Sequence, residues 1–445
     1  MGIPLANILS GTLPAGWVCV HFGKLFEGNP RNGVYKKKDF HGRGVKVVNM
    51  GELFAYDFIS AQEMKRVELS ASELQKYRLL DGDLLFARRS LVLEGSGKCS
   101  IVVSPLEYTT FESSIIRIRL EKKKVMPIFY FYLFHSSIGR ALIASIATRT
   151  AVSGIRASDL PNLEVPFPPL PTQRKIVTTL SAYDDLIENN LQRIKILEEM
   201  AQTIYREWFV KFRFPGHEKT RMVDSPMGKI PDGWGVTTLD SVLSVLESGS
   251  RPKGGIDPSM RDVPSIGAEN ILGLGKYDFS KEKFVSHEFF EKMKRGHLNS
   301  GDVLLYKDGA KIGRKSMFLD NFPHSECCIN EHVFILRANE KCGQAYLFFW
   351  LDQPDITAGI INLNANAAQP GINQKGVKGL PILLPDRKFL DLFDEFVEPL
   401  LAELFNLAKK NHILRRTRDL LLPKLISGKL DVSELEIETG DIVNG

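Results

Sequence analysis

One pattern of residues occurs twice along this chain, at a nearly constant separation. LPAGWVCVHFGKLF at 13–26 corresponds to IPDGWGVTTLDSVL at 230–243, which aligns Trp17 with Trp234 (234 − 17 = 217). GDLLFARRS at 82–90 matches GDVLLYKDG at 301–309 with a shift of 219 residues (301 − 82 = 219). So steady a shift indicates an internal duplication, and the two halves are therefore expected to share one fold.

Each copy ends in a stretch with the hydrophobic spacing of a coiled coil. Apolar residues recur in steps of four and three over 176–208, and the same steps return over 393–421. Each seam contains one asparagine, Asn190 in the first and Asn411 in the second, a device that fixes register at some cost in stability. Because one such helix is not stable alone, we expect the two to pair as an antiparallel coiled coil, the direction that puts the globular parts at opposite ends.

Prolines set the expected limits of these helices. Those at 166–171 exclude a helix before Thr172, and Asp386 is the expected N-cap of the second helix. Pro399 then falls inside the second seam, where a proline removes a hydrogen bond and clashes with the preceding turn. We therefore expect a short helix first, followed by the main coil over about 400–421.

The part before each helix combines short strand-like runs with helical stretches. Runs such as DLLFA, SSIIRIRL, DVLLY and EHVFILRA are typical of strands, whereas PIFYFYLFHSSIGRALIASI and AYLFFWLD are typical of helices. The expected fold class is α/β (α+β), with two similar mixed-sheet domains separated by two long helices in an internal pseudo-twofold repeat. The expected boundaries are a first domain at 1–168, a first helix at 169–214, a linker at 215–229, a second domain at 230–385, a second helix at 386–426 and a tail at 427–445.

Composition narrows the class of protein. No apolar run approaches the ~20 residues that a membrane span needs, and the N-terminus lacks the pattern of a secretory signal. Five cysteines without a CxxC pair suit a reducing compartment, so we expect a cytoplasmic protein. His324, Cys327 and Cys328 suggest a metal site, but adjacent cysteines chelate poorly and no fourth ligand is evident, so buried thiols are the favoured interpretation.

Positive charge is concentrated in two loops. The net charge is only +5, but six basic residues and one acid lie between Arg31 and Lys46, and four basic residues and one acid lie between Val303 and Lys315. Basic, glycine-containing loops on a near-neutral body fit a polyanionic partner. A solvated charged face is an equally good interpretation of either loop taken alone.

Three phrases of the sequence point to one family. PFPPLPTQRKIV at 166–177, DSPMGKIPDGW at 224–234 and LLPKLISGKLDV at 421–432 together resemble the specificity subunit of type I restriction–modification systems, over essentially the whole chain. The resemblance implies two target-recognition domains, each followed by a spacer helix, that read an asymmetric bipartite sequence in double-stranded DNA. It also implies partners: two methyltransferase subunits that methylate adenine, and restriction/translocase subunits that join through them.

The resemblance further implies that this chain binds no cofactor and works in a prokaryotic cytoplasm. S-adenosylmethionine, ATP and Mg²⁺ would then belong to the partner subunits. The expected helix length is compatible with such a role, because the 26 residues of 183–208, at ~1.5 Å each, span roughly 39 Å, close to the ~34–36 Å of one turn of B-DNA. The helices would act as a ruler between two unlike half-sites.

The residues expected to contact DNA lie in the basic and amide-rich loops of both domains. Arg and Lys suit guanine and Asn and Gln suit adenine, while other members of the set would hold phosphates or make no contact. In the first domain the candidates are Arg31, Lys36, Lys37, Lys38, Arg43, Lys46, Arg88, Arg89, Ser90, Arg149 and Arg156. In the second domain they are Ser250, Arg251, Lys253, Lys307, Lys311, Arg314, Lys315, Asn366, Gln369, Asn373, Gln374 and Lys375.

Other distinctive residues have simpler interpretations. Trp17 and Trp234 are expected in the domain cores, and Trp208 in the seam. Outward-facing helix residues such as Arg193 and Arg206 face either the methyltransferase subunits or solvent.

No catalytic motif accompanies these features. GxxxxGK[ST] and [DN]PP[YF] are absent, and GSGK at 95–98 lacks the flanking residues of a phosphate loop. Asp308 and Glu331 resemble acid/base residues, but nothing in the sequence pairs them. We therefore expect a non-catalytic subunit; the alternatives are a DNA-binding scaffold, the specificity module of another multisubunit restriction–modification enzyme, and a single-chain enzyme, which the missing motifs oppose.

Overall fold

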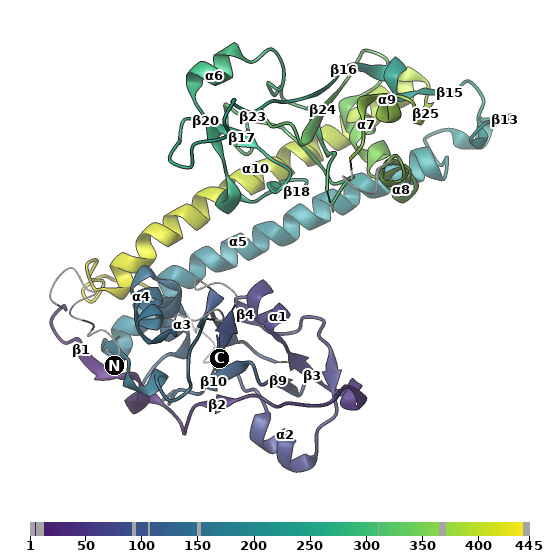
Figure 1. Cartoon of the computed structure of the whole chain (residues 1–445). Coiled ribbons are helices and arrows are strands. Elements are labelled where there is room, and N and C mark those ends of the chain that lie inside the picture. The colour runs from purple at the N-terminus through teal and green to yellow at the C-terminus, as the bar shows by residue number, and fades with distance from the viewer. Residues whose placement is uncertain are drawn as a thin grey trace. The chain divides into compact units, whose positions relative to one another are not determined.

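The computed structural model describes residues 5, 13–90, 95–105, 107–148, 153–309, 311–364 and 371–438. The chain divides into two compact units (Figure 1). Unit 1 comprises Met1–Asp185 with Leu414–Gly445, and unit 2 comprises Leu186–Ile413. Each unit contains one globular part together with neighbouring portions of both long helices, α5 (Leu170–Tyr205) and α10 (Arg387–Ile426).

A five-stranded mixed sheet lies at the centre of unit 1. The β8–β4 pair is parallel, and the other pairs are antiparallel. Side chains alternate between two buried faces, because Leu84 and Phe86 join one hydrophobic cluster while Leu85 and Ala87 join another. The strand order is β2 (Arg31–Asn32), β10 (Ile115–Ile118), β6 (Leu84–Ala87), β8 (Cys99–Val102) and β4 (Phe58–Ile59).

Helices and a smaller sheet cover the two faces of this central sheet. One face packs against α3 (Pro127–His135) and α4 (Ser137–Ile146). The other packs against a second sheet and two short helices, namely β5 (Arg66–Val67), β3 (His41–Val48), β9 (Thr109–Phe111), α1 (Met50–Ala55) and α2 (Ala71–Tyr77). Two ribbons complete the unit, β1 (Val18–His21) with β12 (Glu164–Phe167) and β7 (Arg89–Ser90) with β11 (Ser153–Gly154).

Unit 2 repeats the main sheet of unit 1. Its order β16–β24–β21–β22 corresponds to β2–β10–β6–β8, and all pairs are antiparallel. These strands are β16 (Leu243–Ser248), β24 (Val333–Ala338), β21 (Val303–Tyr306) and β22 (Lys315–Met317). The smaller sheet is β20 (Phe284–Val285), β17 (Val263–Ile266) and β23 (Cys328–Ile329), and the ribbons are β18 (Ile271–Gly273) with β19 (Lys276–Tyr277) and β15 (Gly235–Thr238) with β25 (Pro381–Leu384). The helices are α6 (His287–Lys292), α7 (Gln344–Leu351), α8 (Pro354–Asn362) and α9 (Gln374–Lys378).

Two buried contacts occur at matching positions in both units. The Asp83 carboxylate accepts two hydrogen bonds of 2.7 Å from Arg119, and Asp302 accepts two of 2.7 Å from Arg337. The Tyr130 hydroxyl donates to the Pro166 carbonyl oxygen at 3.2 Å, as Tyr346 does to Leu383 at 2.6 Å. The expected α/β duplication is therefore confirmed down to individual side-chain contacts.

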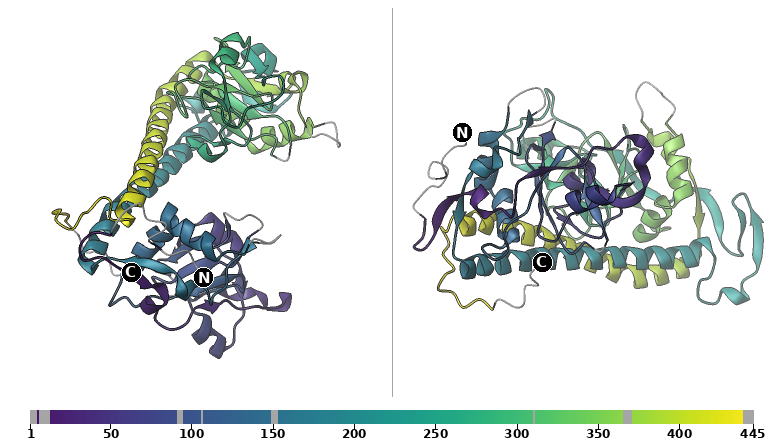
Figure 2. Two further views of the ribbon diagram at one scale, coloured as in Figure 1. Left: turned by 60° about the vertical axis from the view of Figure 1, so that its left-hand side comes forward. Right: turned by 90° about the horizontal axis from the view of Figure 1, so that it is seen from below.

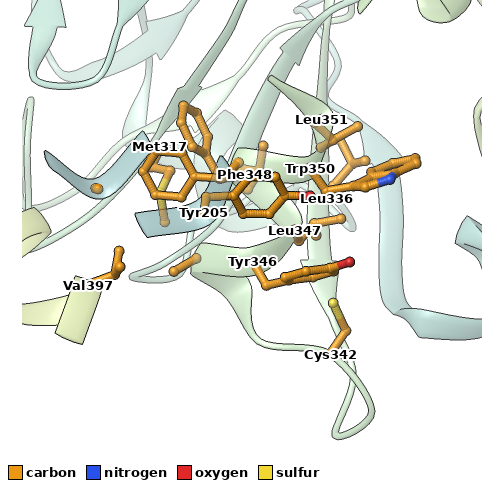
Figure 3. Packing of buried hydrophobic residues seen from close by; sticks show 14 of the residues in the cluster. Tyr205, Met317, Leu336, Cys342, Tyr346, Leu347, Phe348, Trp350, Leu351 and Val397 are labelled. Atoms are coloured by element: carbon orange, nitrogen blue, oxygen red, sulfur yellow. The ribbon is translucent and has the colours of Figure 1, made fainter. Parts of the chain in front are cut away.

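The core of unit 2 is built around aromatic side chains of α5, α7 and α10. All residues from Ala345 to Leu351 are buried, so α7 is enclosed on every side. The ring of Tyr346 lies 5.5 Å from that of Tyr205 and 4.8 Å from that of Phe209 (Figure 3). Trp17 and Trp234 are 6% exposed, which confirms both as core residues.

Within unit 2, α5 and α10 lie side by side and run in opposite directions (Figure 2). As α5 advances from Asn190 to Tyr205, its partners on α10 recede from Asn411 to Phe393. The Asn190 Nδ2 donates to the Asn411 Oδ1 at 2.9 Å, and both amides are buried. Because a slip of one heptad would separate the two asparagines and set one of them against a leucine, this pair favours the observed register of the antiparallel helices, the direction that the sequence predicts.

The expected break at Pro399 is wrong. Helix α10 continues through it as one helix of 40 residues. Pro399 is exposed, and so is Glu395, whose carbonyl loses its helical N–H partner to the proline, so the break in the hydrogen-bond ladder lies on the exposed side of the helix. Helix α5 likewise begins at Leu170 rather than after the prolines, because Pro171 falls in the first turn, where no N–H partner is needed.

The expected linker and tail both contain ordered structure. Residues 222–231 form a hairpin, β13 (Met222–Ser225) with β14 (Gly228–Pro231). The tail packs within unit 1, where Val432 is 3% exposed and Lys175 Nζ donates to the Ser433 carbonyl oxygen at 2.6 Å. The described residues of the tail, 427–438, are thus part of the folded unit.

Cys327 and Cys328 are buried free thiols. Cys328 Sγ lies 3.8 Å from the Pro264 carbonyl oxygen, and burial raises the pKa of Cys328 to about 11. The His324 imidazole contacts Glu282, while the Cys327 thiol donates to the His324 carbonyl oxygen at 3.9 Å. Among the described residues, no group of three or more His, Cys, Asp or Glu is arranged to hold a metal. Over the same part of the chain, no helix combines the length and apolar character needed to cross a membrane.

Candidate nucleic-acid interface

Four loop segments of unit 1 meet at one end of the central sheet, where β6 ends. Gly33 N donates to the Ile115 carbonyl oxygen at 3.0 Å, and Arg88 N donates to that of Ser114 at 2.8 Å. Ile155 N then donates to the Arg88 carbonyl oxygen at 3.0 Å. These bonds place residues 31–38, 112–114, 88–90 and 153–156 next to one another, and we call this set loop edge 1.

Unit 2 carries the same arrangement. Lys307 N donates to the His332 carbonyl oxygen at 3.1 Å, and Ile372 N donates to that of Lys307 at 2.9 Å. Arg251 Nε joins the cluster through Glu331 Oε1 at 3.0 Å. Residues 249–253, 330–332, 307–309 and 371–375 form loop edge 2. The structure therefore brings together candidates that lie far apart in the sequence.

Several candidate side chains at or beside the two edges carry uncompensated positive charge. Within the described residues, no carboxylate lies at ion-pair distance from the exposed Lys37, Lys38, Arg89, Arg156, Lys253, Lys311 and Lys375. Arg31, Arg88, Ser90, Ser250 and Gln374 are half-buried at the same edges. Charges of one sign without partners are suited to phosphate contacts, and guanidinium groups also suit guanine.

Other candidates already have acidic partners. Lys36 lies 2.7 Å from Glu73, Arg43 lies 2.8 Å from Glu68, and Lys307 lies 3.4 Å from Asp308. The hydrogen bond from Lys36 lowers the pKa of Glu73. Surface pairs of this kind contribute roughly 0–1 kcal/mol, so a phosphate is able to compete for the cation.

Lys46 and Lys315 are buried members of the predicted set. Lys46 is 7% exposed, and its Nζ donates to the carbonyl oxygens of Ala61 and Gln62 at 3.2 and 3.0 Å. Lys315 is also 7% exposed and donates to the Thr357 hydroxyl at 2.9 Å, and burial lowers its pKa. Lys46 lies on β3 and Lys315 on β22, each next to other buried residues, so both cations are enclosed by the fold.

Two further arginines and three amides complete the account. Arg314 is half-buried and Nη1 donates to the Ile271 carbonyl oxygen at 3.2 Å. The Asn373 side chain caps α9 by accepting from Gly376 N at 2.8 Å, which fixes it beside the exposed Lys375. Arg149, Asn366 and Gln369 lie outside the described residues.

Sequence reasoning missed a mixed-charge network in loop edge 2. His332 Nδ1 lies 3.0 Å from Asp308 Oδ2, and His332 Nε2 lies 3.5 Å from Glu331 Oε1. The expectation that nothing pairs these two acids is therefore wrong. Each acid also contacts a cation, Lys307 or Arg251, so the arrangement is a surface ion network that orients basic side chains. No motif in the sequence signals it, because its members lie up to 81 residues apart (332 − 251 = 81).

Comparison with known proteins bears directly on this interface. Residues 14–199 match the family model described as type I restriction modification DNA specificity domain. This segment of the chain is such a DNA specificity domain. It contains all of loop edge 1 and most of α5, so the resemblance seen in the sequence is confirmed.

Full-length similarity extends beyond the matched specificity domain. The chain is 24% identical over 402 residues to the type I restriction enzyme MjaIX specificity subunit of Methanocaldococcus jannaschii, covering 90% of each. It is 20% identical over 460 residues to the type I restriction enzyme HindI specificity subunit of Haemophilus influenzae, covering 91% of this chain and 98% of that protein.

The fold is also similar to that of a solved specificity subunit. The type I restriction–modification S subunit from M. genitalium matches with a TM-score of 0.55 at 17% identity, covering 94% of this chain and 97% of that one. At this identity the likeness concerns the fold.

Proposed function

We propose that this chain is the non-catalytic, DNA-reading specificity subunit of a type I restriction–modification complex. Each unit would read one half of an asymmetric bipartite target, and partner subunits would methylate adenine or cleave the DNA. The main support is that two loop edges share one backbone arrangement but carry unlike side chains. A duplicated scaffold with different contact residues suits an unsymmetrical target, since identical edges would read identical half-sites.

At each loop edge, different charged or polar side chains are suited to phosphates and to base edges. The exposed lysines of the 31–38 segment, Lys37 and Lys38, are suited to phosphates, which set the position of the protein on the duplex. Arg89, on the ribbon β7–β11, and Arg156, two residues after its end, are exposed and suited to base edges in the major groove. Asn373, held by its cap at the position matching Arg156, gives the second half-site a different reader (373 − 156 = 217).

Partner subunits would dock on the outward side of the long helices. On α5, Leu186, Ile196 and Met200 are 55%, 54% and 47% exposed. At 100° per residue they fall within an arc of about 80°, so they form one apolar stripe on the helix. Arg193 is instead engaged with Glu403 at 2.9 Å across the helix pair. The proposed occupants are two methyltransferase subunits, with restriction/translocase subunits joining through them.

Under this proposal the chain itself holds no cofactor. S-adenosylmethionine would serve the methyltransferase subunits, and ATP and Mg²⁺ the translocase subunits. The role of this chain is then to select the DNA sequence, to bind it and to orient the partner subunits on it.

Sequencing of methylated adenines in cells with and without the gene tests the proposal. We expect an asymmetric bipartite motif to be methylated only when the chain and its methyltransferase partner are both present. An unchanged methylation pattern in cells that express the partner contradicts the proposal, and so does methyl transfer by the purified chain alone. As a second test, exchanging residues 13–168 for another recognition domain is expected to change one half of the motif and leave the other half intact.

A further inference from the structure

Tyr35 is the most exposed large hydrophobic side chain of the described residues. It is 78% exposed, ahead of Ile413 at 62%. Within the described part of the chain, its ring packs against no other aromatic ring and no cation. A tyrosine ring is apolar on its faces and polar at its hydroxyl, so one this exposed on a nucleic-acid-facing edge is suited to contact a partner outside the chain.

The backbone holds Tyr35 firmly despite this exposure. A Cβ at Gly33 would lie 2.2 Å from the carbonyl oxygens of Phe111 and Glu112, so only glycine allows the chain to pass this close. Val34 then bridges to Glu112, and Val34 N donates to the Phe111 carbonyl oxygen at 2.9 Å. On the other side Lys36 is tied down by Glu73.

The strand register shows which residue takes this place in unit 2. In unit 1, Asn32 lies opposite Ile116 on β10, and in unit 2, Ser248 lies opposite Phe334 on β24. Counting three residues onward from Asn32 and Ser248 gives Tyr35 and Arg251. Gly249 matches Gly33 in the same way, because a Cβ there would lie 1.7 Å from the Ile329 carbonyl oxygen. Tyr35 and Arg251 therefore hold one position in the two loop edges.

We propose that Tyr35 contacts a base edge in the half-site read by unit 1, at the position that Arg251 fills in unit 2. This inference rests on the proposed DNA-reading function. A tyrosine ring presents an apolar face that suits the methyl group of thymine, whereas arginine suits the acceptors of guanine. Lys37 and Lys38 follow directly in the sequence and are suited to hold the adjacent phosphates. Because the matched position holds tyrosine in unit 1 and arginine in unit 2, the two half-sites should differ at the base pair that it contacts.

The test measures sequence preference in the whole complex. Full-length chains carrying Tyr35→Ala or Tyr35→Arg are assembled with the methyltransferase partner and bound to a library of duplexes randomised across the wild-type target. We expect Tyr35→Ala to lose about tenfold discrimination at one base pair of one half-site, the scale of a single lost base contact. We expect Tyr35→Arg to redirect that position toward guanine. Preference in the other half-site should stay unchanged for both variants.

Tyr108→Ala is the matched control. Tyr108 is 53% exposed, its ring lies 4.2 Å below the Arg78 guanidinium, and it precedes β9 at the end away from Glu112. Its removal should leave the sequence profile unchanged, and thermal unfolding should be unchanged for all variants.

Two outcomes overturn the inference while leaving the proposed function standing. One is an unaltered profile for Tyr35→Ala. The other is equal weakening on every sequence, which identifies a phosphate contact. A wild-type complex without any sequence preference overturns the proposed function itself.

Discussion

Loop edges 1 and 2 have the same backbone path but differ in how their charged side chains are paired. At the described positions of edge 1, Arg89 and Arg156 stand without acidic partners, whereas edge 2 places Asp308 where edge 1 has Arg89 (308 − 89 = 219). Edge 2 then links its cations through Glu331, His332 and Asp308. The difference teaches that the contacts which build the fold are kept in both units, while the side chains at the edge vary freely around them.

The largest expected effect on the free energy of unfolding comes from removing the buried aspartate that occurs at the equivalent position of each unit. Asp83→Ala should destabilise unit 1, and Asp302→Ala unit 2, each by roughly 2–3 kcal/mol, because a nearly buried carboxylate with two charged hydrogen bonds is lost. Hydrogen exchange resolved by peptide should show the loss of protection in the mutated unit. The control is Asp81→Ala, whose pair with Lys122 is more exposed. Equal losses in both units from a single mutation would refute independent scaffolds.

Removing the tail should destabilise unit 1 and leave the stability of unit 2 unchanged. Truncation after Gly428 exposes the site of Val432 and removes the bond from Lys175 to Ser433. We expect unit 1 to lose about 2 kcal/mol, the scale of one buried aliphatic side chain, while unit 2 keeps its stability. Denaturant titration followed by peptide-resolved exchange checks this, and a loss confined to unit 2 would contradict it.

A third comparison concerns one matched position on the long helices. Asp394 on α10 corresponds to the fully buried Val177 on α5 (394 − 177 = 217). Asp394 Oδ1 has no hydrogen-bond partner among the described residues, and burial raises the pKa of Asp394 to about 7. A raised carboxyl pKa means that the folded state binds the proton more tightly than the unfolded state. Its penalty is therefore absent below the usual pKa of about 3.9, grows as pH rises, and is complete above about 7.

Asp394→Asn should therefore stabilise unit 2 at pH 8, by about 1 kcal/mol after allowance for its partial exposure, and should make little difference at pH 4. Thermal unfolding measured across this pH range tests it. Glu395→Gln, an exposed neighbour on the same helix, is the control. A stabilisation that does not depend on pH would show that ionisation of Asp394 is not its cause.

The smallest expected effects are changes in DNA affinity on substituting Arg89 in loop edge 1 and Asp308 in loop edge 2. Arg89→Ala should lower affinity for the cognate duplex and, if its contact is to phosphate, reduce the salt slope by about one. Asp308→Ser should instead raise affinity a few-fold, because it removes an acid from a surface that faces polyanions. Binding titrations at several salt concentrations distinguish the two. A gain in affinity from both substitutions would contradict the assignment of these edges to DNA.

The sequence predicts the architecture well because its largest signals are periodic. The duplication and the paired seams, each with one asparagine, follow from spacing alone, whereas the hydrogen bond between Asn190 and Asn411 is a finding of the structure. The burial of Lys46 could not be predicted, because Lys46, Val47 and Val48 are buried in a row, without the alternation that marks a half-buried strand in the sequence. The importance of Tyr35 depends on exposure, which composition does not report.

The division of the chain between the units has a consequence for biosynthesis. Unit 2 is one uninterrupted segment, 186–413, whereas unit 1 needs residues on both sides of it. As the polypeptide leaves the ribosome, everything unit 2 requires is available before the closing stretch of α10 for unit 1 has been made. Unit 1, whose synthesis begins first, is therefore the unit whose folding is completed last. Until the end of α10 has been made, the hydrophobic surface that packs against Leu422, Leu425 and Ile426 remains exposed.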